Sequence, residues 1–307
     1  MSKGSGGKDL DVLVFGEALV DFFADPHLTP LWEAPAFRPH LGGAPANLAI
    51  GLARLGARAA LATLVGRDPF GRFVRERLAA AGVDVQLVGE HEAARTGVTF
   101  VAIDEHGERS FVFFRHPSAD LCVTPEHVGA DAVARARVTH VGSSTLAREP
   151  ARAATWRVVD YARAAGRRVS CDVNFRARLW ENPSEFRPLL ARLLARCWVA
   201  KLSEEEIDPL LGTRDPEEAC ARVCALGAEI AIVTLGADGC VWASAGETGR
   251  LGAPHVEVVD TTGAGDAFMA ALLAALLRGA TLAEACASGN EFGARACTAV
   301  GATTALG

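Results

Sequence analysis

Apolar residues follow two alternating patterns along most of the chain. Short apolar runs occupy residues 12–15, 59–65, 138–141, 168–173, 198–202 and 230–235. Between and after them, apolar residues recur at helical spacing over residues 48–55, 70–81, 152–164, 185–194, 216–226, 266–277 and 282–298. Short continuous apolar runs are typical of the buried strands of a parallel sheet, and the helices between them cover its faces. The alternation therefore predicts an α/β fold with a mainly parallel central sheet and helices on both faces.

One region departs from this alternation and predicts a second, smaller sheet. Residues 96–103 and 109–115 are strand-like and are joined by Glu105-His106-Gly107-Glu108, with no helical pattern between them. Such a pair is typical of a β-hairpin. Residues 21–40 are rich in proline and aromatic residues and are non-helical, so we expect them to add strands to the hairpin.

The domain organisation predicted from these patterns is one α/β domain with an inserted lid. The lid consists of residues 21–40 and 96–117, and the glycine- and serine-rich residues 1–8 are expected to be a disordered N-terminus. The α/β domain takes the remaining segments, which are residues 9–20, 41–95 and 118–307.

Composition and charge narrow the classes of partner. Of the 307 residues, 50% are apolar and 22% are charged, which is typical of a compact globular protein. The net charge of −6 argues against nucleic acid, because proteins that bind its phosphates carry clustered Lys and Arg. No stretch has the length and composition of a signal peptide or a membrane span, so we expect a cytoplasmic protein that binds small molecules.

The eight cysteines are spread singly and form no Cys-x-x-Cys pair, which predicts reduced thiols packed in the core. Cys220 and Cys224 stand one helical turn apart, but two thiols without further ligands nearby favour packing over metal binding.

The candidate chemistry centres on a glycine-rich turn before an apolar helix. Residues 256–259 are strand-like, and a turn of small residues leads from Asp260 to the helix that starts at residue 266. The first N–H groups of a helix lack intrahelical partners, and the helix dipole favours an anion there. The backbone amides of Gly263, Ala264 and Gly265 are therefore predicted to form an anion hole for a phosphoryl group.

Asp266 follows directly and has two interpretations from the residues alone. Its carboxylate could accept the proton of an attacking hydroxyl as a general base, or it could merely cap the helix. Other glycine motifs fit poorly, because Phe268 stands where a dinucleotide fingerprint has its third glycine and no Lys-Ser or Lys-Thr follows.

A second glycine-rich turn precedes the helix that contains Leu48. Gly42 and Gly43 allow a ligand to approach the backbone closely, and Asn47 offers a donor and an acceptor to sugar hydroxyls. By itself this segment would equally be a turn followed by an ordinary asparagine.

Together the two turns resemble the signatures of the ribokinase-like (PfkB-type) carbohydrate kinases. The first signature matches GGAPANLAIGLARLG at residues 42–56 with VGRD at 65–68, and the second matches DTTGAGDAF at 260–268. The resemblance covers nearly the whole chain. It implies a three-layer α/β/α fold with a β lid, and it favours the general-base interpretation of Asp266.

The resemblance also implies a sugar site. Asp21 corresponds to the family's acidic contact to sugar hydroxyls, and Arg115 and Arg176 match arginines of the lid end and of the Asp-x-Asn-x-Arg pattern. The implied substrate contacts are Asp21, Gly42, Gly43, Asn47, Arg115 and Arg176. Outside the family context Arg115 would be a solvated strand charge.

On the nucleotide side, the residues that match the family's ATP contacts are Asn174, Ser203, Thr234, Gly236, Gly239 and Asn290. Without the resemblance, Thr234 would be an ordinary strand residue and Asn290 an amide on a helix surface. Glu206 is expected to orient Mg²⁺ through water, although Ser203 replaces the asparagine usual before this glutamate. A monovalent cation, potassium, would involve Asp260 and the Thr262 carbonyl.

The resemblance thus implies an ATP-dependent sugar kinase that phosphorylates a primary hydroxyl, with fructose giving fructose 6-phosphate as the first choice. The alternatives are a 2-keto-3-deoxygluconate kinase and then a ribokinase or nucleoside kinase. A nucleotide- or sugar-binding regulator without catalysis is the alternative of another class. In relatives the lid closes over the sugar and pairs two subunits, so a homodimer through the lid is expected.

Overall fold

The central sheet has nine strands among the residues that the computed structural model describes, which are 9–26, 28–103, 109–115 and 118–306. The strand order is β13-β12-β11-β10-β9-β8-β1-β4-β5. The strands are β1 (Leu10–Phe15), β4 (Ala59–Gly66), β5 (Val88–His91), β8 (Ala136–Gly142), β9 (Arg168–Asp172), β10 (Val199–Ser203), β11 (Ile230–Thr234), β12 (Cys240–Ser244) and β13 (Thr248–Leu251). The pairs from β5 to β11 are parallel, and β12 and β13 add an antiparallel edge.

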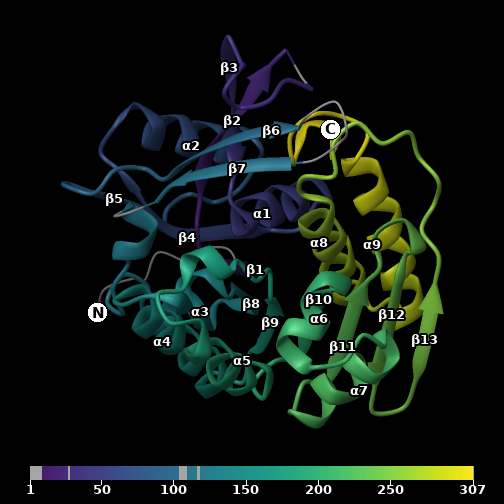
Figure 1. Cartoon of the computed structure of the whole chain (residues 1–307). Helices are drawn as coiled ribbons and strands as arrows, with labels where there is room; N and C mark the ends of the chain where they lie inside the picture. Colours follow the sequence, from purple (N-terminus) through teal and green to yellow (C-terminus); the bar gives the residue numbers. More distant parts are fainter. Residues whose placement is uncertain (1–8, 27, 104–108, 116–117, 307) are drawn as a thin grey trace, which may run out of the picture.

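Helices cover both faces of this sheet (Figure 1). One face carries α1 (Ala44–Arg54), α2 (Pro69–Ala80), α8 (Ala264–Leu277) and α9 (Leu282–Ala296). The other carries α3 (Ala130–Ala134), α4 (Ala151–Ala164), α5 (Phe186–Leu194), α6 (Glu204–Leu211) and α7 (Pro216–Ala225). Short 3-10 turns lie at Ala119–Cys122, Ser144–Ala147, Ala177–Leu179, Pro183–Glu185, Gly236–Asp238 and Thr304–Leu306.

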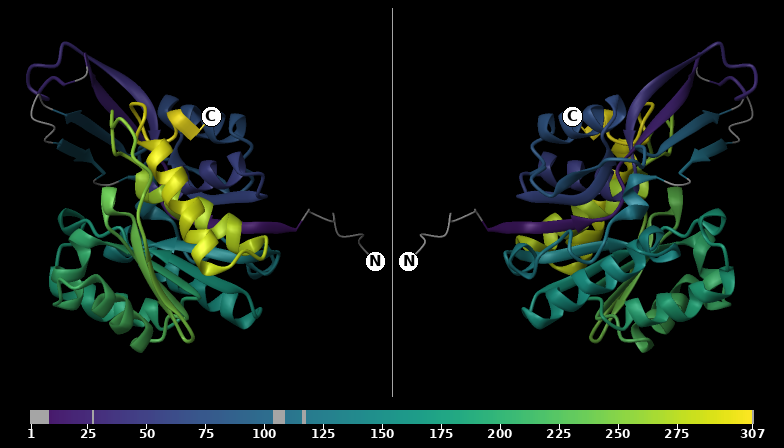
Figure 2. Two further views of the ribbon diagram at one scale, coloured as in Figure 1. Left: turned by 90° about the vertical axis from the view of Figure 1, so that its right-hand side faces the viewer. Right: turned by 90° about the vertical axis from the view of Figure 1, so that its left-hand side faces the viewer.

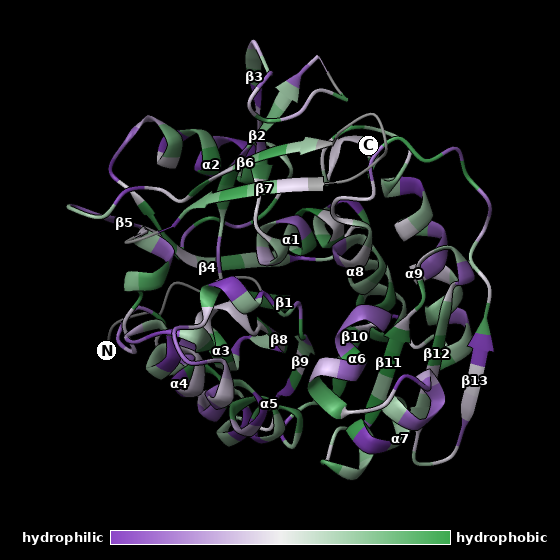
Figure 3. Cartoon of the chain, in the orientation of Figure 1, coloured by the Kyte–Doolittle hydropathy of each residue, from purple (hydrophilic) through white to green (hydrophobic). Residues whose placement is uncertain are grey.

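Strand β1 shows why the sheet is apolar on both sides. Val12 and Val14 pack in the cluster under α1 and α8, whereas Leu13 and Phe15 pack in the cluster under α4. Successive side chains of a strand point to opposite faces, so a strand buried on both faces is apolar at every position. Figure 3 shows the same contrast, with hydrophobic central strands and helices that are hydrophilic on part of their surface.

A separate four-stranded sheet projects from the α/β body (Figure 2). Its order is β3 (Ala36–Gly42), β2 (Leu19–Asp25), β6 (Val98–Ile103) and β7 (Arg109–Phe114). β2 and β6 are parallel, and the outer pairs are antiparallel. The prediction that residues 21–40 add strands to the hairpin is confirmed, whereas its turn at 105–108 and the N-terminal residues 1–8 lie outside the described residues.

The predicted α/β alternation and fold class are confirmed, with one wrong strand. Residues 256–259 lie outside the sheet: the Val259 N–H donates to the Cys297 carbonyl after α9 at 2.8 Å, and the Val258 side chain is 58% exposed. The β-branched pattern predicted a strand, but no strand in the described part of the chain pairs with it. Strands β5, β12 and β13 and helices α3 and α6 were not predicted. None of the helices in the described ranges is long and apolar enough to cross a membrane.

Candidate active site

A cavity of about 470 Å³ lies where the carboxyl ends of β9, β10 and β11 meet the first turn of α8, beneath the small sheet. Residues from both glycine-rich turns and from the small sheet line it. The predicted site residues in its wall are Asp21, Gly43, Asn47, Arg115, Asn174, Arg176, Ser203, Glu206, Thr234, Gly236, Thr262, Gly263, Ala264, Gly265 and Asp266. Segments more than two hundred residues apart in sequence therefore share one site.

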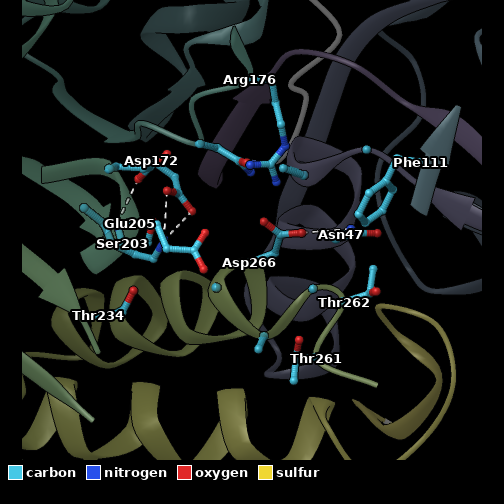
Figure 4. Close-up of a pocket in the computed structure, with 18 of the residues that line it drawn as sticks. Asn47, Phe111, Asp172, Arg176, Ser203, Glu205, Thr234, Thr261, Thr262 and Asp266 are labelled. Atoms are coloured by element: carbon cyan, nitrogen blue, oxygen red, sulfur yellow. Dashed lines mark hydrogen bonds and ion pairs between the residues drawn. The ribbon is translucent and has the colours of Figure 1, made fainter. Parts of the chain in front are cut away.

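Asp266 projects into this cavity from the first turn of α8 (Figure 4). Its Oδ2 accepts a hydrogen bond of 2.8 Å from Asn47 Nδ2, and the residue is only 8% exposed. Burial, followed by the negative charge of Asp172, raises the pKa of Asp266 to about 7. A carboxylate with such a pKa can take up a proton near neutral pH, as a general base must.

The glycine turn before Asp266 presents free backbone amides to the cavity. Gly263 has φ +79°, and a Cβ there would lie 2.4 Å from the Ala302 Cβ, so only glycine fits. Within the described part of the chain, the N–H groups of Gly263, Gly265 and Asp266 have no hydrogen-bond acceptor. The Ala264 N–H makes a long bond of 3.3 Å to the Thr261 carbonyl. Of the three amides predicted to form an anion hole, that of Ala264 is thus engaged in the turn, and the anion hole stays a prediction.

A buried ion pair forms the floor of the cavity beside this turn. Lys201 Nζ contacts both carboxylate oxygens of Asp172 at 2.9 Å, and the two residues are paired neighbours on β10 and β9. Burial opposes the charge of the lysine, but Asp172 and Glu206 raise the pKa of Lys201 above its ordinary value. A Cβ on Gly265 would lie 3.2 Å from the ammonium, which places this cation directly beside the amides.

The part of the cavity around Asn47 and Asp21 contains a buried polar atom without a hydrogen-bond partner in the described ranges. Asn47 Oδ1 is buried and has no hydrogen-bond partner among the described residues. Burial raises the pKa of Asp21 to about 6. Gly42, a predicted sugar contact, does not line the cavity; it packs against Asp21, because a Cβ there would lie 2.0 Å from the carboxylate. Its role in this structure is to make room for Asp21.

Arg115 is not the solvated strand charge that one interpretation expected. It is 5% exposed, lines the cavity and forms an ion pair with Asp120, which also accepts a hydrogen bond of 2.6 Å from Ser118 Oγ. The Asp120 carboxylate thus holds the guanidinium in the cavity wall.

An apolar hollow of about 260 Å³ adjoins the cavity, and both share Thr234, Gly236 and the turn of α8. Gly239 and Asn290 line this hollow and not the main cavity. Asn290 is 5% exposed and donates to the carbonyls of Leu251 and Gly252 at 3.2 Å, so it is not a helix-surface amide. An apolar hollow beside the amides of this turn suits a nucleoside whose phosphates reach them.

Two predicted metal ligands have structural partners. One oxygen of Glu206 accepts from the Ser203 N–H at 2.8 Å and the other from the Phe175 N–H. The Asp260 carboxylate accepts from the N–H groups of Thr262 and Gly301, each at 2.9 Å, and does not line the cavity.

In the described ranges no three His, Cys, Asp or Glu side chains gather as a metal site. That Glu206 reaches a magnesium ion through water stays a prediction. The monovalent cation at Asp260 and Thr262 stays a prediction.

Among the cavity residues that sequence reasoning missed, three are buried and charged, which are Glu17, Asp172 and Lys201. A usable signal existed for Lys201, because it is the one charged residue in the apolar run of residues 198–202. Buried lysines are paired or functional. Glu17 accepts a hydrogen bond from Ser144 Oγ, and no sequence pattern links these two residues.

The two cysteines one helical turn apart pack as expected. The thiol of Cys220 donates to the Val241 carbonyl at 3.8 Å, and that of Cys224 donates to the Ala243 carbonyl at 3.5 Å. Both carbonyls belong to β12, so these thiols join α7 to the sheet.

The cavity brings together the amides at the start of α8, a buried cation and a buried carboxylate, which are the groups that a phosphotransferase acting on an alcohol needs. The chain belongs to the pfkB family of carbohydrate kinases, whose family model matches residues 9–306.

The relatives and solved structures that resemble this chain include several named as sugar or riboside kinases. The fructokinase of Klebsiella pneumoniae is 41% identical over 302 residues, which cover 96% of this chain and 95% of the relative. A crystal structure of Vibrio cholerae O395 fructokinase with fructose, ADP and calcium has a TM-score of 0.86 at 36% identity, covering 96% of this chain and 95% of that one. Aminoimidazole riboside kinase of Salmonella enterica, with its riboside and an ATP analogue, has a TM-score of 0.84 at 34% identity, covering 96% of both chains.

Proposed function

We propose that the enzyme transfers the γ-phosphoryl group of ATP to the primary hydroxyl of fructose, giving fructose 6-phosphate and ADP. The observation that carries the proposal is the position of Asp266. Its buried carboxylate, with a pKa of about 7, stands one residue after amides that have no acceptor in the described part of the chain.

In this mechanism the acceptor hydroxyl lies against Asp266, and Asn47 orients the carboxylate through its 2.8 Å hydrogen bond. Asp266 accepts the hydroxyl proton as the oxygen forms its bond to phosphorus and the bond to the ADP oxygen breaks. The amides of Gly265 and Asp266 and the Lys201 ammonium stabilise the charge on the transferred group. Magnesium, held through water by Glu206, would neutralise charge on the nucleotide phosphates.

Fructose is the first choice of acceptor on two grounds. The stretch DVNFRARLW at residues 172–180 is similar to fructokinases, although it also resembles 2-keto-3-deoxygluconate kinases. Relatives named as fructokinases are 36% to 41% identical over most of the chain. The second candidate is a riboside, which the similarity to the Salmonella kinase favours.

A panel of acceptors tests the proposal. ADP release by the purified enzyme with Mg-ATP is compared for fructose, 2-keto-3-deoxygluconate, ribose and aminoimidazole riboside. We expect the highest kcat/KM with fructose. A clear preference for a riboside would overturn fructose as the acceptor, and ligand-dependent thermal stabilisation without turnover would favour the binding regulator.

The small four-stranded sheet, which forms the predicted lid, supports the proposal of a homodimer. Val112 and Phe114 on β7 are 45% and 60% exposed, and the Phe100 ring lies 5.7 Å from that of Phe114. An exposed aromatic face of this kind is stabilised when a second copy covers it. Light scattering of the wild type and of the Phe114→Ser variant tests this, and a monomeric wild type would exclude it.

A further inference from the structure

The side chain of His40 packs the small four-stranded sheet against the C-terminal end of the chain, and Figure 1 shows these two parts side by side. His40 lies on β3 directly opposite Asp21 on β2, so the strand pair that places Asp21 in the cavity wall also carries this ring. A Cβ on Gly301 would lie 2.6 Å from His40 Nδ1, so the imidazole occupies the place of a side chain on Gly301. The Phe23 ring supports the imidazole from β2, with ring centroids 5.1 Å apart and planes at 70°.

Gly301 and its neighbour Ala302 in turn contact the glycine-rich turn before α8. The Gly301 N–H donates to Asp260 Oδ2 at 2.9 Å, and Asp260 begins this turn. Ala302 fills the space beside Gly263, where a Cβ would come within 2.4 Å of the Ala302 Cβ. Two successive residues therefore contact His40 on one side and the turn that presents the amides on the other.

His40 itself lines neither of the spaces that would hold the reactants. It is absent from the wall of the main cavity and from that of the apolar hollow beside it. The half-buried ring makes packing contacts with Gly301 and Phe23. An effect of this ring on turnover therefore has to pass through the residues against which it packs.

We propose that His40 is a positioning residue, which transmits the placement of the acceptor at the small sheet to the backbone amides at the start of α8. The inference rests on the proposed function, because it takes Asp21 as a contact of the acceptor and the amides as the groups that stabilise the transferred phosphoryl group. An acceptor that binds Asp21 fixes β2 and, through it, β3 with His40. The ring then holds Gly301 and Ala302 against the turn at Gly263. Hydrogen-bond donors stabilise a transition state only when they are in place, so phosphoryl transfer to the bound acceptor is favoured over transfer to water.

The test measures a ratio of two rates at saturating Mg-ATP, which are ADP release with saturating fructose and ADP release without an acceptor. A merely structural role of His40 would change the fraction of folded enzyme and therefore both rates alike, leaving the ratio unchanged. The variants are His40→Ala, His40→Phe and, as a matched control on the same strand, Arg38→Ala. The Arg38 side chain is 73% exposed and pairs with Asp25.

In His40→Ala the ratio should fall about tenfold or more, because the amides are no longer set in place when the acceptor binds. The KM for fructose should stay within about threefold of the wild type, since the ring is not a contact of the acceptor. His40→Phe should keep the ratio within about threefold, because a flat ring of similar size fills the same space. Arg38→Ala should leave the ratio unchanged.

A second set of variants tests the contact between His40 and Gly301. Gly301→Ala places a methyl group against the ring and should lower the ratio, whereas Gly279→Ala, also at φ +89° but with nothing within 4 Å, should not. Because His40→Ala and Gly301→Ala break the same contact, their fold losses should not multiply in the double variant. Losses that multiply would show that the two residues act independently, and would overturn the proposed connection.

Failure of the positioning role and failure of the proposed function give different results. A wild-type ratio in His40→Ala would overturn the role of His40 and leave the kinase proposal intact. Turnover of a riboside in place of fructose would overturn fructose as the acceptor, and the ratio for each variant is then measured with that riboside. ADP release that no acceptor of the panel stimulates would overturn both.

Discussion

Asn47 Nδ2 donates a hydrogen bond of 2.8 Å to Asp266 Oδ2 across 219 positions of sequence. This contact joins the first turn of α1 to the first turn of α8, and so brings the two glycine-rich turns into one site. The remaining amide oxygen of Asn47 is buried without a partner among the described residues, which leaves it available to an acceptor hydroxyl. One asparagine can therefore hold both the carboxylate and the substrate.

The first prediction concerns the pH profile of this pair. A general base must be ionised, so kcat/KM should fall as pH drops through the pKa of Asp266, about 7. The hydrogen bond from Asn47 lowers that pKa, so Asn47→Ala should move the acidic limb to higher pH. Profiles of both enzymes from pH 5 to 9 with the same Mg-ATP measure the shift, because titration of the nucleotide is common to both. Superimposable limbs would contradict the role of Asn47.

The second prediction is that the ionised Asp266 carboxylate lowers the stability of the folded protein. The pKa of Asp266 rises from an ordinary 3.8 to about 7 in the fold, so the folded state binds the proton more tightly than the unfolded chain does. The stability that this tighter proton binding contributes to the fold is complete below about pH 4 and is lost as pH rises through about 7. Asp266→Asn stays neutral and avoids this loss, which is on the order of 4 kcal/mol for about three pKa units at 1.4 kcal/mol each.

Thermal unfolding of the wild type and of Asp266→Asn at pH 8 and pH 4.5 checks this cost. The variant should melt several degrees higher at pH 8, and the difference should narrow at pH 4.5. A variant that is less stable than the wild type at pH 8 would show that the buried carboxylate is not destabilising.

The third prediction compares two glycines with similar backbone angles. Gly263 has φ +79° and Gly279 has φ +89°, but a Cβ at Gly279 meets nothing within 4 Å. Both alanine variants should lose about 1 kcal/mol from the left-handed conformation. Only Gly263→Ala should also displace the amides, because its Cβ would collide with Ala302, and so lower kcat at least tenfold. Equal kcat values in the two variants would argue against the anion hole.

The fourth prediction separates the structural and electrostatic roles of the Lys201–Asp172 pair. Lys201→Met leaves a buried carboxylate without its partner and should cost about 3 to 5 kcal/mol of stability. Adding Asp172→Asn should restore much of that stability, because the orphaned charge is removed. Turnover should stay at least 10²-fold below the wild type in the double variant, since the cation beside the amides is still missing. Recovery of both properties would limit the pair to a structural role.

The sequence predicted the layers of the fold better than its edges. β1 and α8 were found because both are buried, and a buried element carries a clear apolar pattern. β13 was missed because an antiparallel edge strand is half exposed and lacks a continuous apolar run. β12 has four buried apolar residues in a row at residues 240–243, so a usable signal existed there and was overlooked. Residues 256–259 were assigned to a strand wrongly, because β-branched propensity does not show whether a neighbouring strand is available.

The candidate site was predictable where its residues lie in the two glycine-rich turns. Asp266 and Asn47 could be named because each follows its turn directly, although only the structure shows that they touch. Lys201 and Asp172 could not be paired from sequence, because their contact depends on the register of β10 against β9. The role of Gly42, which is to leave room for the Asp21 side chain, likewise depends on packing that the sequence does not show.

The most direct test of the account is the turnover of Asp266→Asn with fructose and Mg-ATP, measured beside nucleotide binding. Asparagine keeps the shape of the side chain and its contact with Asn47 but cannot take a proton. The account predicts that kcat falls about 10²- to 10⁴-fold while the affinity for ATP stays within about threefold of the wild type. A variant with nearly normal kcat would contradict the assignment of Asp266 as the general base.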